Sequence, residues 1–258
     1  MSYVVAVLQA RISSTRLPRK VLLPLLGEPM LGRQIERIRQ AHSPDELIVA
    51  TSADPSDDIL AAECARLSVA CSRGSLSDVL DRFHHAIEPT RATVVVRLTG
   101  DCPLICPDIL DAVVAFREQG NFEYVSNVRE PTFPDGLDVE VMTRESLNRA
   151  WAQARLASER EHVTPYIWKQ PDQFRIGSYK GHADYSAHRW TVDEPRDFTL
   201  VSAIYERLYP ANPNFRMADV LHLLQSQPEL TRLNAGITAN MGYLKSIESD
   251  SKSERGGP

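Results

Sequence analysis

Cysteine is scarce in this chain of 258 residues, which has four, at Cys64, Cys71, Cys102 and Cys106. Four thiols in this length do not make a disulfide scaffold, so we expect reduced and mostly buried thiols. No apolar run approaches the roughly 18 residues that a membrane-spanning helix needs. Met1 leads straight into a strand-like segment, without the basic and apolar regions of a signal peptide. These absences predict a cytoplasmic protein with no membrane partner.

An excess of positive charge is also lacking. The chain has 29 Lys and Arg residues against 34 Asp and Glu residues, which gives a formal net charge of −5. A general affinity for nucleic acid or for anionic membrane requires the opposite balance. The composition therefore indicates no nucleic-acid partner, although it leaves open a basic binding site on an acidic body.

The standard glycine motifs of nucleotide sites are missing as well. No G-x-G-x-x-G follows a strand-like segment, and Gly27–Gly32 has the glycine spacing of a phosphate-binding loop without its ending. Arg33-Gln34 follows where Lys and then Ser or Thr are required. A phosphate site in this protein must therefore depend on cationic side chains more than on a glycine cradle.

Strand-like and helix-like segments alternate through the first half of the chain. Strands that alternate with helices of about 10–15 residues imply β-α-β crossovers, so we expect an α/β fold with a mainly parallel sheet flanked by helices. The expected strands are Tyr3–Gln9, Glu46–Thr51, Val69–Cys71 and Thr93–Leu98, and the expected helices follow Pro29 and cover Ser56–Leu67, Ser77–Ile87 and Pro107–Glu118.

The second half is less regular and is expected to complete the same domain. We predict one domain over residues 1–245, with a smaller β-rich insertion over about 124–180 and a disordered tail over 246–258. That tail is polar and has no large apolar residue beyond Ile247. The expected strands here are Tyr124–Ser126, Val139–Met142 and Phe174–Tyr179, and the expected helices are Ser146–Leu156, Glu161–Trp168, Pro195–Tyr209 and Met217–Gln225.

The segment Leu8–Lys20 is the strongest candidate for binding an anion. It reads L-Q-A-R-I-S-S-T-R-L-P-R-K, with four cations, three hydroxyls and no acid. Ligands of open α/β sheets gather beyond the carboxyl ends of strands, and this segment follows the first expected strand. Its backbone N–H groups, hydroxyls and charges suit a triphosphate. The alternative is a basic surface loop without a ligand, which the acidic composition disfavours.

Two later carboxylates are candidates for holding a metal ion. Asp101 ends the buried run V-V-V-R-L-T-G-D, and Asp193 lies in R-W-T-V-D-E-P. Mg²⁺ usually takes one or two protein carboxylates together with phosphate oxygens of a substrate. The alternative for each is a structural role, as a turn residue for Asp101 and as a helix cap for Asp193.

Taken together, these motifs resemble the cytidylyltransferases that activate acidic sugars, such as the acylneuraminate and 3-deoxy-manno-octulosonate cytidylyltransferases. The resemblance is greatest to their branch in spore-coat or surface-polysaccharide biosynthesis. It extends from Val4 to Phe198 and rests on A-R-x-x-S-x-R-L-P-x-K, T-G-D-x-P, E-H-V-T-P and W-T-V-D-x-P-x-D, in the family's order. Arg19 is a departure, because the family often has glycine before the lysine of the first motif.

The resemblance implies a Rossmann-like nucleotide-diphospho-sugar transferase sheet with an inserted acceptor and dimerisation arm. It implies that CTP and an acidic deoxy sugar, of the nonulosonic or octulosonic type, give a CMP-sugar and pyrophosphate with Mg²⁺ as cofactor, in a homodimer. By position, the catalytic residues would be Arg11, Arg16, Lys20 and Asp101, and the metal ligands Asp101 and Asp193. The nucleotide would be bound by Leu8, Ala10, Arg11, Ser14, Arg16, Lys20, Ser72, Arg73, Gly74, Asp78, Thr99 and Gly100. The acceptor would be bound by Asp135, Asp138, Glu140, Glu161 and His162.

Other functions of the same fold stay open at this stage. One alternative is a nucleotidyltransferase for a sugar phosphate or polyol phosphate, and another is a glycosyltransferase that uses a nucleotide sugar. The late W-T-V-D motif and the lack of a D-x-D metal motif argue against the glycosyltransferase. A non-catalytic nucleotide-binding domain would bind its ligand without releasing pyrophosphate. No dedicated general base is evident, and His162 is the candidate for that role.

Overall fold

The apolar run near the start of the chain forms the centre of the sheet. The computed structural model describes residues 2–237, 243, 246–248, 250 and 251. In it, β1 (Val4–Gln9) lies between β4 (Glu46–Ser52) and β6 (Val94–Thr99) and is parallel to both. Successive side chains of a strand point to opposite faces. Accordingly, Ala6 and Leu8 join the core on one face of the sheet and Val7 joins the core on the other.

Seven strands make up the sheet, in the order β5-β4-β1-β6-β8-β7-β9. β5 (Ala70–Gly74) is parallel to β4 at one edge, and β7 (Tyr124–Ser126) is parallel to β9 (Ile176–Ser178) at the other. β8 (Glu140–Thr143) alone in this sheet runs against its neighbours, β6 and β7. The mainly parallel α/β fold is therefore confirmed. A small antiparallel hairpin of β2 (Pro24–Leu25) and β3 (Glu28–Pro29) lies apart from this sheet.

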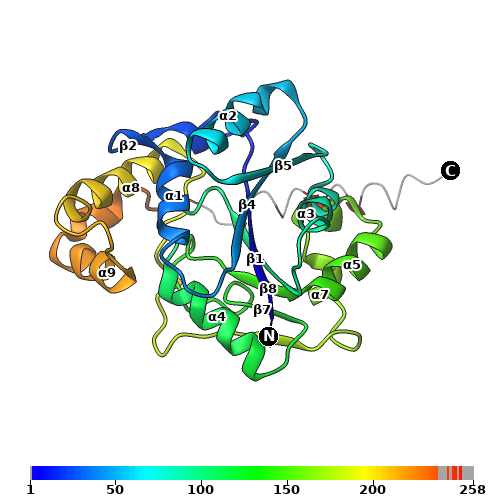
Figure 1. Ribbon diagram of the computed structural model, residues 1–258. Helices are drawn as coiled ribbons and strands as arrows, with labels where there is room; N and C mark the ends of the chain where they lie inside the picture. The colour runs from blue at the N-terminus through cyan, green and yellow to red at the C-terminus, as the bar shows by residue number, and fades with distance from the viewer. Residues whose placement is uncertain (1, 238–242, 244–245, 249, 252–258) are drawn as a thin grey trace.

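Helices cover both faces of the sheet (Figure 1). Apolar side chains of the helices α1, α2, α4, α8 and α9 pack on one face, and those of α3, α5 and α7 pack on the other. The first group is α1 (Met30–Ile38), α2 (Asp58–Arg66), α4 (Pro107–Gln119), α8 (Pro195–Leu208) and α9 (Met217–Ser226). The second group is α3 (Val79–Ile87), α5 (Arg144–Gln153) and α7 (Pro165–Trp168), next to the short α6 (Ala157–His162). Three 3₁₀ turns cover Lys20–Leu22, Pro55–Asp57 and Pro228–Arg232.

The residues expected to form an inserted β-rich arm, about 124–180, instead continue the main sheet. β8 pairs with β6 from Val94 opposite Thr143 to Arg97 opposite Glu140, and β7 and β9 add to it in turn. Three helices, α5, α6 and α7, occupy the same stretch. The expectation of a β-rich arm was wrong in this respect, because short strand-like segments do not reveal which sheet they join.

The expected tail is partly ordered. Residues 246–248, 250 and 251 are helical, whereas 249 and 252–258 lie outside the described part of the chain. The Ser246 hydroxyl donates to Glu161 at 2.8 Å, and Asp250 accepts from the backbone N–H of Ser158 at 3.2 Å. Disorder was the wrong expectation for these residues, since polar contacts with α6 hold them in place of apolar packing.

The predictions about thiols and membrane spans concern the described residues. All four cysteines are free, and three of them, Cys64, Cys102 and Cys106, are buried, whereas Cys71 is exposed. Reduced and mostly buried thiols were expected. Among the helices that the structure describes, none has the length and apolar character to cross a membrane.

Candidate active site

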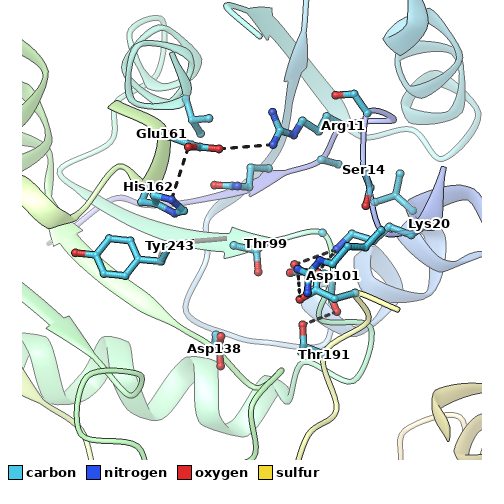
Figure 2. A pocket seen from close by; sticks show the side chains of 18 of the residues that line it. Arg11, Ser14, Lys20, Thr99, Asp101, Asp138, Glu161, His162, Thr191 and Tyr243 are labelled. Atoms are coloured by element: carbon cyan, nitrogen blue, oxygen red, sulfur yellow. Dashed lines mark hydrogen bonds and ion pairs between the residues drawn. The ribbon is translucent and has the colours of Figure 1, made fainter. Parts of the chain in front are cut away.

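A cavity of about 680 Å³ opens beyond the carboxyl ends of β1 and β6. The chain leaves β1 towards β4 on one side and returns through α3 to β6 on the other, so the sheet order reverses here. Such a reversal opens a crevice in which α/β proteins bind ligands. Residues of the loop after β1, of the T-G-D turn, of α6 and of the segments around 135–138 and 189–193 line the cavity (Figure 2).

The T-G-D turn lies directly against the end of β1. Gly100 donates its backbone N–H to the carbonyl oxygen of Gln9 at 2.8 Å. A Cβ atom at Gly100 would lie 2.9 Å from that oxygen, so a side chain at this position would push the two segments apart. Glycine is therefore needed here for close approach, and it brings Asp101 beside the loop that carries Arg16 and Lys20.

The predicted cations and carboxylates meet in one network. Lys20 Nζ lies 3.2 Å from Asp101 Oδ2 and 2.9 Å from Asp193 Oδ1, and it donates to the carbonyl oxygen of Val192 at 2.8 Å. Arg16 pairs with the other oxygen of Asp193 at 2.8 Å. The T-G-D turn and the W-T-V-D segment, about 90 residues apart in the chain, thus meet the loop after β1, as expected from the sequence.

The pKa values of two groups in this network, Lys20 and Asp101, are shifted so that both stay charged. Burial alone would lower the pKa of Lys20, but the carboxylates of Asp101 and Asp193 outweigh it and raise that pKa above its usual range. Burial alone would likewise raise the pKa of Asp101, yet Lys20 and hydrogen bonding lower it to about 2. Lys20 and Asp101 are therefore both charged at neutral pH, as a site for phosphate and metal requires.

The donor set fits Mg²⁺ if a substrate supplies further oxygens. Lys20 Nζ lies between Asp101 and Asp193, so both carboxylates already face a shared cationic position. Within the described part of the chain, no three His, Cys, Asp or Glu residues are grouped so that they could hold a metal by themselves. Two carboxylates completed by phosphate oxygens and water match the usual coordination of Mg²⁺.

Arg189 organises this network, and the sequence analysis did not assign it a role. Its guanidinium lies 3.0 Å from Asp135, 3.3 Å from Asp193 and 3.0 Å from the buried Asp197. Asp197 also accepts from the backbone N–H of Asp193 at 3.0 Å, at the start of α8. The order R-x-x-x-D-x-x-x-D was visible in the sequence, but the spacing alone did not predict which charges would pair.

The segment 135–138 is held against residues 189–191 by the backbone. Trp190 and Thr191 both donate to the carbonyl oxygen of Asp135, at 2.6 and 2.9 Å. Gly136 has φ +108°, and a Cβ atom there would lie 2.5 Å from the nitrogen of Thr191. This close contact fixes Asp135 and Asp138 at the cavity wall.

The carboxyl groups of this segment differ from Asp101. Burial, opposed only in part by Arg189, raises the pKa of Asp135 to about 6. Burial and the neighbouring Asp135 raise the pKa of Asp138 to about 7, and its carboxyl accepts a hydrogen bond from the Gly136 N–H at 3.3 Å. Near neutral pH, Asp138 is therefore partly protonated.

Arg11, Glu161 and His162 lie across the cavity from Lys20 and Asp101 (Figure 2). Arg11 is 3.8 Å from Glu161, and both side chains are about two-fifths exposed, so this ion pair is weak. His162 Nε2 lies 3.0 Å from the Ser246 hydroxyl, and Tyr243 packs edge-on against the imidazole ring. Burial lowers the pKa of His162, so its neutral form predominates at pH 7.

Several predicted site residues do not line the cavity. Leu8 is buried in the core, and Ser72, Arg73 and Gly74 belong to edge strand β5. The Arg73 guanidinium instead binds the carbonyl oxygens of Ser52 and Asp54. Asp78 caps α3 and accepts from Arg160 at 2.8 Å. A role of these residues in binding cytidine stays a prediction.

The other predicted residues do line it, and they are Ala10, Arg11, Ser14, Arg16, Lys20, Thr99, Gly100, Asp101, Asp135, Asp138, Glu161, His162 and Asp193. Glu140, expected in the acceptor pocket, lies behind Arg97, which does line the cavity. Arg82 lines it too, although its side chain is buried, and burial together with Arg11 lowers its pKa to about 10. Sequence reasoning missed Arg97, and the signal that could have found it is a single charge within the apolar run V-V-V-R-L.

Arg19, which stands where the resembling family often has glycine, adopts a left-handed conformation with φ 60°. Glycine populates this region without steric cost, whereas other residues do so at a cost of about 1 kcal/mol. The departure therefore keeps the loop conformation that glycine would allow.

Comparisons with known proteins agree with this geometry. A sequence profile described as cytidylyltransferase matches residues 5–209. The spore coat polysaccharide biosynthesis protein SpsF of Bacillus subtilis is 33% identical over 238 residues, which cover 89% of this chain and 97% of that protein. A 3-deoxy-manno-octulosonate cytidylyltransferase of Zea mays is 38% identical over 44% of this chain and 38% of that protein.

Solved structures share the fold. A cytidylyltransferase from Leptospira borgpetersenii is 30% identical and superposes with a TM-score of 0.86, covering 92% of this chain and all of that one. A second structure is that of a CMP:2-keto-3-deoxy-manno-octonic acid synthetase complexed with CTP, with a TM-score of 0.61 over 80% of this chain and 99% of that one. At 18% identity it shows likeness of fold alone. With the profile match spanning most of the chain and its charged motifs meeting in one cavity, the protein belongs to the cytidylyltransferase family and is a CTP-dependent nucleotidyltransferase.

Proposed function

We propose that this enzyme transfers CMP from CTP to a hydroxyl of an acidic deoxy sugar, of the nonulosonic or octulosonic type, for surface-polysaccharide or glycoconjugate biosynthesis. The observation that carries the proposal is the convergence of Arg16 and Lys20 with Asp101 and Asp193 in one cavity. The similarity to 3-deoxy-manno-octulosonate cytidylyltransferases supports an acidic acceptor, and the similarity to SpsF supports a role in polysaccharide biosynthesis.

In the proposed reaction, the sugar hydroxyl oxygen forms a bond to the α-phosphorus of CTP. The bond from that phosphorus to the bridging oxygen breaks, and pyrophosphate leaves with the electron pair. Arg11, Arg16 and Lys20 offset the negative charge of the triphosphate and of the leaving pyrophosphate. Transfer at phosphorus depends on positioning and charge neutralisation more than on covalent catalysis, so a set of prearranged cations serves it well.

Mg²⁺ is the cofactor that we propose for Asp101 and Asp193. When bound, it neutralises phosphate charge and lowers the pKa of an oxygen that it holds. Lys20 now balances the two carboxylates, and we infer that it turns towards phosphate oxygens when CTP binds. Its raised pKa keeps the amine charged throughout.

The acceptor is proposed to lie between Asp138 and the pair Glu161 and His162, on the side of the cavity away from Lys20. The hydroxyl proton must leave during attack. Neutral His162 is one acceptor for it, and its hydrogen bond with the Ser246 hydroxyl fixes the ring orientation. Asp138, also placed beside the acceptor, is partly protonated near neutral pH.

Pyrophosphate release tests the proposal. The protein is incubated with Mg²⁺, one of the four ribonucleoside triphosphates, and either a 2-keto-3-deoxy acid or a polyol phosphate. We expect release with CTP and an acid, and little release with ATP, GTP or UTP. Release with a polyol phosphate alone would instead favour the sugar-phosphate alternative, and binding of CTP without any release would favour a non-catalytic domain.

A homodimer formed through residues of the stretch 124–180, and a cytoplasmic location, also stay proposals. Light scattering on the purified protein tests the first, with twice the mass of 28.9 kDa as the expected result. A single-chain mass at micromolar concentration would contradict it.

A further inference from the structure

Arg97 is a charged residue inside an otherwise apolar central strand. It interrupts the run V-V-V-R-L-T of β6, where the neighbouring side chains are buried. Its register partner across β6 and β8 is Glu140, and the two side chains form an ion pair. Both are largely buried, with 13% of the Arg97 side chain and 10% of the Glu140 side chain exposed. A buried pair of this kind costs desolvation and does not by itself argue for stability.

The carboxylate of Glu140 accepts hydrogen bonds from three side chains. Besides Arg97, its carboxylate accepts from the Tyr124 hydroxyl and from the Thr164 hydroxyl, the latter at 2.7 Å. Arg97 lines the cavity, whereas Glu140 lies behind it. Glu140 therefore fixes the guanidinium from the rear and leaves its other side towards the cavity.

The guanidinium of Arg97 is not saturated. One nitrogen, NH1, bonds to Glu140, and the buried Nε–H has no acceptor among the described residues. A guanidinium carries five N–H donors in a planar fork that suits a carboxylate. By contrast, Arg16 pairs with Asp193, a carboxylate that itself lines the cavity, and Arg189 donates from all three guanidinium nitrogens to Asp135, Asp193 and the buried Asp197.

Acidic side chains also line the cavity. They include Asp135, Asp138 and Glu161, and an anionic acceptor beside them meets repulsion. Arg11 offsets part of that charge, but it faces Glu161 at 3.8 Å. An acidic acceptor here needs a cation whose own counter-ion lies outside the cavity. Arg97 is such a cation, because its counter-ion Glu140 does not line the cavity.

We propose that Arg97 binds the carboxylate of the acceptor and so determines the preference for an acidic sugar, with Glu140 as the residue that positions it. This inference rests on the proposed function for the acidic nature of the acceptor. It assigns Glu140 an indirect role, in place of the direct acceptor contact that the sequence implied.

Calorimetric titration tests the inference without turnover. Protein saturated with CTP in EDTA is titrated with 3-deoxy-manno-octulosonate, with N-acetylneuraminate, with the methyl ester of each, and with glycerol 3-phosphate. We expect at least one acid to bind at least about tenfold more tightly than its ester, since an ester lacks the charge that Arg97 recognises. Arg97→Lys should lose most of that ratio, because an ammonium cannot reproduce the planar fork.

Matched variants separate recognition from folding. Glu140→Gln should lower the acid-to-ester ratio by less than Arg97→Lys does, and both should keep the affinity for CTP within about twofold. Arg175→Gln, at an exposed arginine outside the cavity, should change neither quantity. If Arg97→Lys does not fold, the double variant Arg97→Gln with Glu140→Gln removes both charges together and should also lose the ratio.

An acid-to-ester ratio that persists in Arg97→Lys or in the double variant would overturn the inference. So would equal binding of acid and ester, absence of binding by both acids, or tighter binding of glycerol 3-phosphate than of either acid by the unaltered protein. Addition of Mg²⁺ then tests the proposed function separately. If an acid binds through Arg97 but no pyrophosphate is released, the carboxylate site stands and the transfer reaction fails.

Discussion

The charged groups at the two ends of the cavity differ in their ion pairing and in their pKa values. At the end formed by Arg16, Lys20, Asp101 and Asp193, each cation lies within 3.2 Å of a carboxylate. The pKa of Lys20 is raised and that of Asp101 is lowered, so both groups stay charged. At the opposite end, Asp138 has a pKa raised to about 7, and its carboxyl is held by one long hydrogen bond.

This difference indicates two kinds of preparation for a ligand. The first end has its charges already paired, and we propose that a triphosphate with its metal replaces these internal ion pairs. Because the charges are already in position, little reorganisation is left for the reaction itself. At the second end, Asp138 is partly protonated near neutral pH and accepts a long hydrogen bond. We propose that a bound acceptor completes the hydrogen bonding of this carboxyl.

The largest expected effect comes from Asp101→Asn. The change keeps the side-chain volume but removes a charge from the proposed metal site, so pyrophosphate release should fall by roughly a thousandfold. The thermal midpoint should change far less, because Lys20 still pairs with Asp193. Asp108→Asn, at an exposed carboxylate, is the control. Release at the normal rate by the Asp101 variant would remove this residue from the site.

Lys20→Ala should have the next largest effect, on the use of CTP. Loss of the amine leaves Asp101 and Asp193 unbalanced and takes one cation from the triphosphate, so kcat/KM for CTP should fall by about a hundredfold. Steady-state pyrophosphate assays at varied CTP concentrations measure this. Lys180→Ala, at an exposed lysine outside the cavity, is the matched control. An unchanged requirement for CTP would show that the paired end does not bind the triphosphate.

Asp138→Asn tests the other end through the pH dependence of stability. Burial and Asp135 raise the pKa of this carboxyl from 3.8 to about 7 in the folded protein. The folded state therefore binds more protons than the unfolded state between these values, and the free energy of unfolding falls as pH rises through this window. Above pH 7 the ionised group costs about 1–4 kcal/mol, which Asn removes.

Urea unfolding at pH 5 and pH 8, with EDTA and without nucleotide, measures that prediction. Asp138→Asn should stabilise the protein more at pH 8 than at pH 5. Asp172→Asn, an exposed position, should show no such difference. An equal effect of Asp138→Asn at both pH values would contradict the contrast between the two ends.

The smallest effect is expected at Arg19→Gly in the phosphate loop. Glycine relieves the left-handed conformation at φ 60° but has more freedom in the unfolded chain, so the two terms nearly offset. The free energy of unfolding should change by less than about 1 kcal/mol, with kcat/KM for CTP within about twofold. A tenfold loss in kcat/KM would give Arg19 a direct part in the fully paired end of the cavity.

The paired end of the cavity was predictable from sequence to a greater extent than the other. Arg16, Lys20, Asp101 and Asp193 each belong to a recognisable motif, and the β-α-β pattern predicts a mainly parallel sheet in which the segments after β1 and β6 leave from the same edge. Arg97 was not assigned and Glu140 was assigned a direct acceptor contact, because their pairing depends on an antiparallel strand that returns from residue 140, which periodicity does not reveal.

The same limit explains the segment Ser72–Gly74. A strand was expected to end at Cys71, but β5 continues to Gly74 and is the edge of the sheet. Arg73 is bound to the backbone carbonyls of Ser52 and Asp54 and does not line the cavity. The order of strands in a sheet depends on tertiary packing, and it decides which of several strand ends reaches a common ligand.

The most direct test of the central claim is a crystal structure of the protein with CTP and Mn²⁺, in which anomalous scattering locates the metal. We predict a metal peak within coordination distance of both Asp101 and Asp193, with phosphate oxygens in contact with Arg16 and Lys20. A metal bound elsewhere, or a triphosphate that leaves the ion pairs of Lys20 with Asp101 and Asp193 intact, would contradict it.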